Sequence, residues 1–469
     1  MRALLFPPLF FFLLALILVS PYAGVLIWGW VTMMNPHQLA GGWISTFPVN
    51  SAAVGLLVVA LFLHQEPIIP PNNALTILIF VFMIWCVVTT ANALSPAISA
   101  NRADLSFKNM MFGIAVAATT RSRVRCQAMV WVFVLSYAFF GVKGGGFTLS
   151  TGGAGEVVGP AKTSIADRNH LAVVMLMTIP LANYLRLTSA NRVVRVGLVL
   201  LLLLNAVAVL GTFSRGGLIG LSFLGAFFWW SSPHKRLVTV GFLAIAWITW
   251  TVMPPQWFDR MSTIETAADS DASFQGRLDA WHFAFNAASS RLTGVGFSGT
   301  EDGSVFRTFM PNARVVSEGL AAHSIFFQVL GDHGFIGLAL FCAILIAAWR
   351  TAGRLSKVAG ADREWMRQFG KAARVALATY CVASAALSFA YDSSIYCLLG
   401  LLSAMTRIAS KAADAETEPE HRRSLSVPRR IPAEARRRPP APTGIAQADH
   451  FPPPRRKSDP DRGAGNGRS

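Results

Sequence analysis

The sequence predicts an all-α protein that crosses a membrane many times. Of its 469 residues, 53% are hydrophobic and only 14% are charged. The hydrophobic residues gather in many separate runs of about 17 to 25 residues, the length that a helix needs to cross the hydrocarbon core of a bilayer. These observations exclude a soluble fold and predict a polytopic helical protein of about 12 spans with one large periplasmic loop.

Residues 1–142 are expected to form an N-terminal transmembrane region. The stretch 4–34 is expected to make one net crossing, either as a helix broken at Pro21 or with an added interfacial segment. It mimics a secretory signal, but Pro7-Pro8 lie inside it and no small-residue cleavage site follows, so we expect it to be retained. The topology of residues 1–34 stays open at this stage. Three further runs follow at about 47–63, 74–93 and 104–120.

Clusters of Lys and Arg orient the remaining spans, because short loops rich in these residues stay in the cytoplasm. Such clusters occur around Arg121, Arg192 and Lys235 and between Arg350 and Lys371. Pairs of apolar runs between them are expected to form hairpins: 124–142 with 169–187, 196–212 with 216–232, 237–253 with 323–348, and 372–390 with 393–409. The connections 143–168 and 254–322 and the turn near Gly211 then converge on the periplasmic face.

A formal net charge of +17 is typical of proteins that bind nucleic acid, but the positions of the basic residues in this sequence argue against such a partner. They lie in short loops and in residues 410–469, a Pro- and Arg-rich segment that cannot bury enough apolar surface to fold. We predict a disordered basic cytoplasmic tail, which either aids topology as a solvated terminus or attracts anionic lipid head groups. No nucleic-acid partner is expected.

The common catalytic and metal-binding motifs are absent from the sequence. It has no P-loop, no HExxH pair, no GxSxG elbow and no Cys/His metal spacing. The five cysteines are odd in number and lie in apolar stretches, so they are expected to pack as small hydrophobic residues. Neither a metal nor a cofactor is expected.

Two arginines are candidates for binding a phosphate group. Arg215 lies in GTFSRGGLIG at the outer mouth of two apolar spans, and Arg277 begins a segment, 276–297, whose apolar pattern suits an amphipathic surface helix. One interpretation is that Arg215 snorkels to lipid phosphate. The other is that both guanidinium groups clamp a phosphate, which their planar fork suits geometrically.

His323 is the candidate general base, because it lies where the long outer loop meets the next span. A neutral imidazole can accept a proton near neutral pH, although a histidine at such a boundary is also a common structural hydrogen-bonding residue. Lys143, Arg168 and Asn169 bound the loop 143–168 and are possible contributors to the same outer cavity, with snorkelling or loop contacts as the alternative.

Several motifs resemble a known family. His323-Ser324, followed after nine residues by Gly334-Phe335-Ile336-Gly337, is similar to the signature of the bacterial O-antigen ligase and polymerase superfamily. SRGGLIG at Arg215 and GRxxxW at Arg277 resemble two further elements in the same order, with Ile219 where the family often has leucine. WVTMMNPH, YAFFGVKGGGFTLSTGG, VVGP and DRNHLA in the N-terminal half look like the O-glycosylation ligases associated with the exosortase A system.

The resemblance implies a fold like that of C-type membrane glycosyltransferases, with residues 143–409 as the ligase core in the bacterial inner membrane. It implies a glycan donor carried on undecaprenyl diphosphate and an acceptor hydroxyl on protein, lipid A core or another glycan. Arg215 and Arg277 would hold the diphosphate and His323 would deprotonate the acceptor at the periplasmic face. The transfer would invert the anomeric centre without a divalent metal.

Three other functions stay open from the sequence. A polymerase would share the same motifs. A transporter would place charges in mid-span and contain repeats, neither of which we find. A scaffold or lipid-glycan binder would keep the arginines without needing His323. The sequence does not reveal the acceptor, the sugar or the oligomeric state.

Overall fold

The computed structural model describes residues 2–232, 234–270, 272–311 and 319–417. These residues form helices, with no strand among them. Residues 418–469, most of the predicted tail, lie outside the described part. Residues 1–416 form one unit by their internal contacts.

The N-terminal region begins with a broken helix, as the sequence suggests. α1 (Arg2–Val19) and α2 (Pro21–Met34) are separated at Ser20, whose backbone is extended, and Pro21 occupies the first turn of α2, where its missing N–H costs nothing. The elements that follow are α3 (Pro36–Ala40), η1 (Gly42–Ser45), α4 (Val49–Leu63), α5 (Ala74–Ala91) and α6 (Pro96–Thr119).

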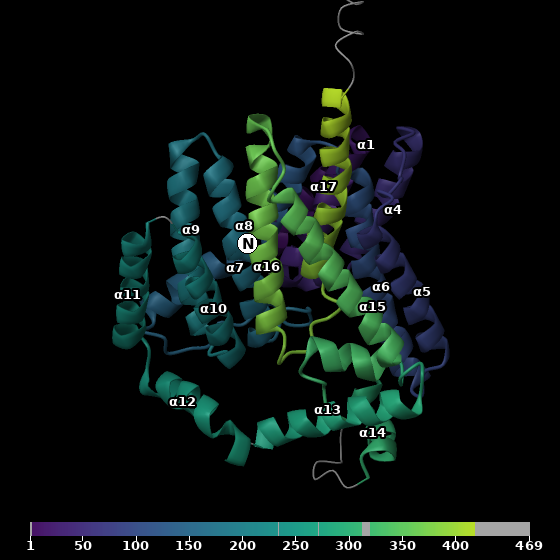
Figure 1. The fold of residues 1–469 in the computed structure, drawn as a ribbon, viewed down its shortest axis with the longest axis vertical. Coiled ribbons are helices and arrows are strands. Elements are labelled where there is room, and N and C mark those ends of the chain that lie inside the picture. Colours follow the sequence, from purple (N-terminus) through teal and green to yellow (C-terminus); the bar gives the residue numbers. More distant parts are fainter. Residues whose placement is uncertain (1, 233, 271, 312–318, 418–469) are drawn as a thin grey trace, which may run out of the picture. The chain divides into compact units, whose positions relative to one another are not determined.

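The central helices are α7 (Arg123–Ser150), α8 (Arg168–Thr188), α9 (Arg192–Gly211), α10 (Arg215–Ser231) and α11 (Lys235–Val252). α8 is buried along most of its length, between α7, α9, α10 and α16 (Figure 1). α7 continues to Ser150, so the first part of the predicted connection 143–168, which is rich in glycine, is helical. The reason is close packing: a Cβ on Gly145 would lie 2.4 Å from the Leu204 carbonyl oxygen of α9, so only glycine permits this approach.

The long connection 254–322 contains its own helices. They are α12 (Pro255–Ser270), α13 (Ala272–Ser290), η2 (Gly299–Glu301) and α14 (Gly303–Phe309). Figure 1 shows α12 and α13 running across the ends of the long helices. α13 buries Phe283, Ala284 and Ala287 and packs on α15. A helix is therefore present where the amphipathic helix was predicted and ends at Ser290, while its position at a membrane surface stays a prediction. Residues 312–318 of this connection lie outside the described part.

The last three long helices are α15 (Ile325–Leu355), α16 (Glu364–Ala383) and α17 (Ser393–Thr417), with η3 (Ala361–Arg363) before α16. α15 is two helices joined by a kink at Gly334, whose φ is 68° (Figure 1). A Cβ on Gly334 would lie 2.3 Å from the Leu292 carbonyl oxygen. The sequence predicted one run, 323–348, because both sides of the kink are apolar. α16 ends seven residues earlier than expected, since residues 384–392 instead form the connection to α17.

Seven of the described helices are long and apolar enough to cross a membrane, namely α5, α7, α8, α9, α11, α15 and Ser393–Ala412 of α17. Shorter apolar helices lie at Leu4–Val19 and Val49–Leu63. α6, α10 and α16 form close to where spans were expected but are not among the seven. α10 has 17 residues, and α16 carries Arg367, Lys371 and Arg374. The count of twelve spans, like the periplasmic placement of the long loop, stays a prediction.

Candidate active site

A cavity of about 310 Å³ lies where six parts of the chain meet. Its polar lining consists of Asn169, Ser214, Arg215, Arg260, Arg277 and His323, and small or apolar residues at and after the end of α16 complete it. These residues come from α8, the α9–α10 turn, α12, α13 and the segment before α15. The structure thus brings together the two arginines and the histidine that the sequence singled out.

Arg215 is positioned by the tight turn between α9 and α10. Phe213 has a positive φ of 55°, and the Ser214 side chain caps α10 by accepting a hydrogen bond from the Gly217 N–H at 3.0 Å. A Cβ on Gly220 would lie 2.6 Å from Leu176 of α8 and 3.0 Å from Ala383 of α16. The glycines of this segment therefore let α10 approach α8 and α16, which places Arg215 beside the end of α16.

Arg260 is a lining residue that the sequence did not single out as a site residue. The Arg215 Nε donates to the Arg260 carbonyl oxygen at 3.3 Å, and the Arg260 Nε donates to the Phe213 carbonyl oxygen at 3.0 Å. Trp257, one turn earlier on α12, donates from its indole nitrogen to the Leu210 carbonyl oxygen at 3.0 Å. These three bonds fasten α12 to the α9–α10 turn, so that the two arginines line one cavity. The only sequence signal that could have indicated Arg260 as a lining residue is its spacing from Trp257, which places both residues on one face of the helix.

Arg277 reaches the cavity from α13. Trp281 lies four residues later, hence on the same face of the helix. Its indole nitrogen donates to the Ala322 carbonyl oxygen at 2.9 Å, and its ring stacks on Phe327 with centroids 4.9 Å apart. The GRxxxW motif therefore has a physical meaning: the tryptophan fixes the helix against the segment that carries His323, and the arginine on the same face points to the same place.

His323 is held in a strained conformation just before α15. Its φ is 45°, in the left-handed region that few non-glycine residues adopt. Its N–H donates to the Ser388 Oγ at 2.8 Å, and the N–H of Ile325 donates to the Ser384 carbonyl oxygen at 3.2 Å. Two bonds to the α16–α17 connection thus fix the backbone that presents the imidazole.

The surroundings of His323 keep its imidazole neutral. Burial lowers the pKa of His323 below its ordinary value, and the nearby Arg277 charge lowers it further, against smaller opposite effects of Asp167 and Glu301. At neutral pH the ring is therefore in the form that accepts a proton. Because α15 begins only at Ile325, the ring lies outside the candidate span.

The three possible contributors from the 143–168 region differ in position. Asn169 lines the cavity, at the start of α8, where Asp167 caps the helix by accepting from the Asn169 N–H at 2.8 Å. Arg168 forms an ion pair with Glu156, and Lys143 is exposed on α7. Neither of these two is among the described residues that line the cavity. His170, which the sequence did not single out, stacks on Phe389 with ring centroids 4.7 Å apart.

The cavity has the electrostatic character of an anion site. Three guanidinium groups line it, and the described lining residues include no carboxylate. Guanidinium forks bind phosphate oxygens in pairs, so a multiply charged phosphate suits this lining. A neutral imidazole beside such an anion can remove a proton from a neighbouring hydroxyl. Within the described ranges, no group of three or more His, Cys, Asp or Glu side chains has the arrangement of a metal site.

Comparison with known proteins divides the chain in two. Residues 1–190 match a family of unknown function (DUF5935), and no curated protein matches the chain. Residues 198–342 match the O-antigen ligase family, and this part contains Arg215, Arg260, Arg277 and His323. The match supports a place for this protein in the O-antigen ligase superfamily, as a multi-pass membrane protein of the glycan ligase or polymerase type.

Proposed function

We propose that this protein is an inner-membrane glycan ligase that transfers an oligosaccharide or polysaccharide from undecaprenyl diphosphate to an acceptor hydroxyl at the periplasmic face. The observation that carries the proposal is the convergence of Arg215, Arg260, Arg277 and His323 on one cavity. The O-antigen ligase match supports the general class of activity. The motifs that resemble exosortase-associated O-glycosylation ligases make a protein hydroxyl one candidate acceptor, beside lipid A core and another glycan.

In the proposed reaction, the diphosphate of the donor lies against the three guanidinium groups while its lipid tail stays in the bilayer. The acceptor oxygen attacks the anomeric carbon from the face opposite the diphosphate. A new C–O bond forms as the bond to the diphosphate breaks with its electron pair, so the configuration at that carbon inverts. Undecaprenyl diphosphate leaves.

The arginines accelerate this step because charge grows on the leaving diphosphate as the bond breaks. Groups that are already in position for that charge stabilise the transition state more than the ground state. Arg215 and Arg260 are held by their reciprocal backbone bonds, so they need little reorganisation during the reaction. His323 accepts the proton of the acceptor hydroxyl, which makes the oxygen a stronger nucleophile.

The test is a deletion strain complemented with wild type, His323→Ala or His282→Ala. His282 is an exposed residue of α13 and serves as the matched control. We expect lipid-linked glycan to accumulate and attached glycan to disappear only with His323→Ala, at equal protein abundance in the membrane. The molecule that carries glycan in the wild-type strain and lacks it in the His323→Ala strain is the acceptor.

Other outcomes separate the alternatives. Unchanged attachment with His323→Ala would contradict the proposed mechanism and favour a scaffold or transporter. If the strain instead loses long glycan chains while single units are still attached, the protein is a polymerase.

A further inference from the structure

A second cavity, of about 410 Å³, lies at the other end of the helices. The loop between α4 and α5, the α6–α7 turn and the last turns of α17 form it, and its lining includes Pro67, Ile69, Arg121, Arg407 and Lys411. α17 begins at Ser393, close in sequence to Leu387 of the first cavity. From Ser393 to Lys411 the helix extends about 27 Å, close to the hydrocarbon thickness of about 30 Å. The two cavities therefore lie near opposite ends of a helix that is long enough to cross a membrane.

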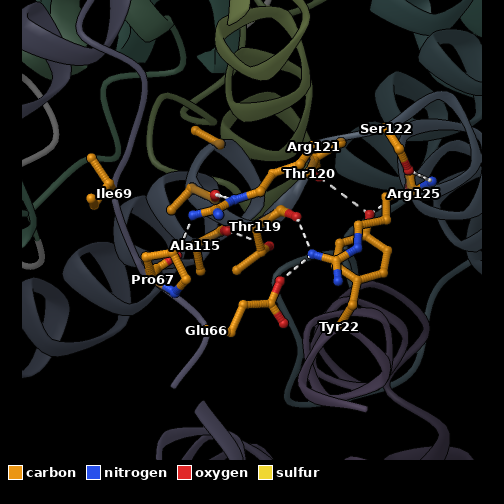
Figure 2. Close-up of polar contacts among 12 residues, drawn as sticks. Tyr22, Glu66, Pro67, Ile69, Ala115, Thr119, Thr120, Arg121, Ser122 and Arg125 are labelled. Carbon is orange, nitrogen blue, oxygen red and sulfur yellow. Dashed lines mark hydrogen bonds and ion pairs between the residues drawn. The ribbon is translucent and has the colours of Figure 1, made fainter. Parts of the chain in front are cut away.

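The two arginines of the second cavity bind backbone oxygens. Arg407 donates from Nη2 to the carbonyl oxygens of Ala117, Ala118 and Thr120 at 2.9, 3.1 and 3.0 Å, and from Nη1 to that of Ile69 at 2.9 Å. Arg121 donates to the carbonyl oxygens of Ala118 and Pro67 (Figure 2). The carbonyls of Ala117, Ala118 and Thr120 lie at the end of α6, and those of Pro67 and Ile69 lie in the α4–α5 loop. A helix end offsets only about half a unit of positive charge.

The nearest acidic side chain of the α4–α5 loop is paired with another arginine and not with those of the cavity. Glu66 forms an ion pair with Arg125, whose guanidinium also lies over the Tyr22 ring, 4.8 Å from its centroid. Figure 2 shows Glu66 directed toward Arg125, and Arg121 directed toward Pro67. Among the described residues that line the cavity, Arg121, Arg407 and Lys411 carry charge and none carries a carboxylate. The lining thus has an excess of positive charge.

The rim of the cavity is apolar. Ile68 and Ile69 are 52% and 67% exposed, and Pro67, Pro70 and Pro71 stiffen the loop that holds them. Exposed isoleucines beside a cationic cavity suit an amphiphile better than a free ion, because an acyl chain covers the apolar rim while a phosphate meets the cations. We propose that this cavity binds the phosphate head group of an anionic membrane lipid, in the leaflet opposite the candidate active site.

Lipid retention by the purified full-length chain tests the proposal, using native mass spectrometry with phosphatidylglycerol or phosphatidylcholine in the detergent. We expect preferential retention of phosphatidylglycerol. Lys411→Gln should weaken this preference about fivefold, since a basic residue near an anionic lipid surface contributes roughly that much. Lys411 makes no side-chain bond to another described residue, so this substitution leaves the bonds of Arg121 and Arg407 intact. Lys411→Arg should keep the preference.

The matched control is Lys357→Gln, an exposed lysine just after α15, whose C-terminal end lies at the same end of the bundle. It should not change retention. Equal retention of both lipids, or the same loss with Lys357→Gln as with Lys411→Gln, would overturn the proposal. Inorganic phosphate at the same concentration as the lipid shows whether the bound phosphate group belongs to a lipid or is free. If inorganic phosphate displaces phosphatidylglycerol and stabilises the protein as well as the lipid does, the site is one for free phosphate. Because retention is measured without glycan transfer, failure here leaves the proposed function untouched.

Discussion

Arg215, Arg260 and Arg277 surround one cavity, and Arg121 and Arg407 surround another at the opposite ends of the long helices. In the first, a neutral imidazole stands among the arginines, and α12 and α13 lie crosswise to complete the lining. In the second, the charged residues of the described lining are Arg121, Arg407 and Lys411, and both arginines are bound to the end of α6. In our two proposals, positive charge alone binds a phosphate group in the second cavity, and a titratable base beside such charge adds reactivity in the first.

The largest expected effect is a loss of glycan transfer without a loss of lipid binding. His323→Ala should lower glycan transfer by about 10²- to 10⁴-fold, the usual contribution of a general base, while phosphatidylglycerol retention stays at the wild-type level. Transfer is measured in reconstituted vesicles that contain the lipid-linked donor. His323→Asn tests the role of the ring more strictly, because asparagine tolerates the left-handed backbone at this position. Substantial transfer by the asparagine variant would exclude the imidazole as the base.

The next largest effect concerns the arginines of the first cavity. Arg215→Gln or Arg277→Gln should each lower the transfer rate about 10²- to 10³-fold, because each removes one preorganised donor to the developing charge. Arg195→Gln, an exposed arginine at the start of α9, is the control and should transfer normally. If the two losses appear only in the Michaelis constant, the arginines bind the donor without stabilising the transition state.

Removal of the α15 kink should impair glycan transfer at the first cavity and leave lipid retention at the second cavity unchanged. Gly334→Ala forces a side chain into a positive φ and against the Leu292 carbonyl oxygen, so it should cost about 1–3 kcal/mol of stability. We expect a lower unfolding temperature and reduced transfer, with lipid retention kept. Gly146→Ala is the matched control, because a Cβ there meets no atom within 4 Å, and it should leave both properties unchanged. Equal effects of the two substitutions would show that the kink does not shape the cavity.

The smallest effect is on pH dependence. Since His323 must be neutral to accept a proton, transfer should fall as the pH drops through its pKa, which burial and Arg277 hold below the ordinary value of about 6.5. In Arg277→Gln, loss of the repelling charge should move this acidic limb of the residual activity to higher pH. Lipid retention should not change over the same range. If the acidic limb of the Arg277→Gln variant stays at the wild-type pH, a group other than His323 titrates there.

The sequence predicted the helices well because long apolar runs and basic clusters have few alternative structures in a membrane. Arg215, Arg277 and His323 were found from their motifs, and the structure brings them to one cavity. Arg260 was missed because its position depends on two backbone bonds between segments 45 residues apart. The helical glycines of α7 and the early end of α16 were also missed, since both depend on close packing with distant helices. Such contacts leave no periodic signal in the sequence.

Under the proposed function, the position of the Gly334 kink determines how far the reacting groups lie from the membrane interior. Residues 335–355 supply about 31 Å of helix, nearly the thickness of the hydrocarbon layer, and the preceding nine residues of α15 turn away at the kink toward His323. This geometry would place the imidazole at the boundary between hydrocarbon and water. We expect a donor with a long hydrocarbon tail to reach it from the bilayer, and an acceptor that carries hydroxyl groups to reach it from the aqueous side.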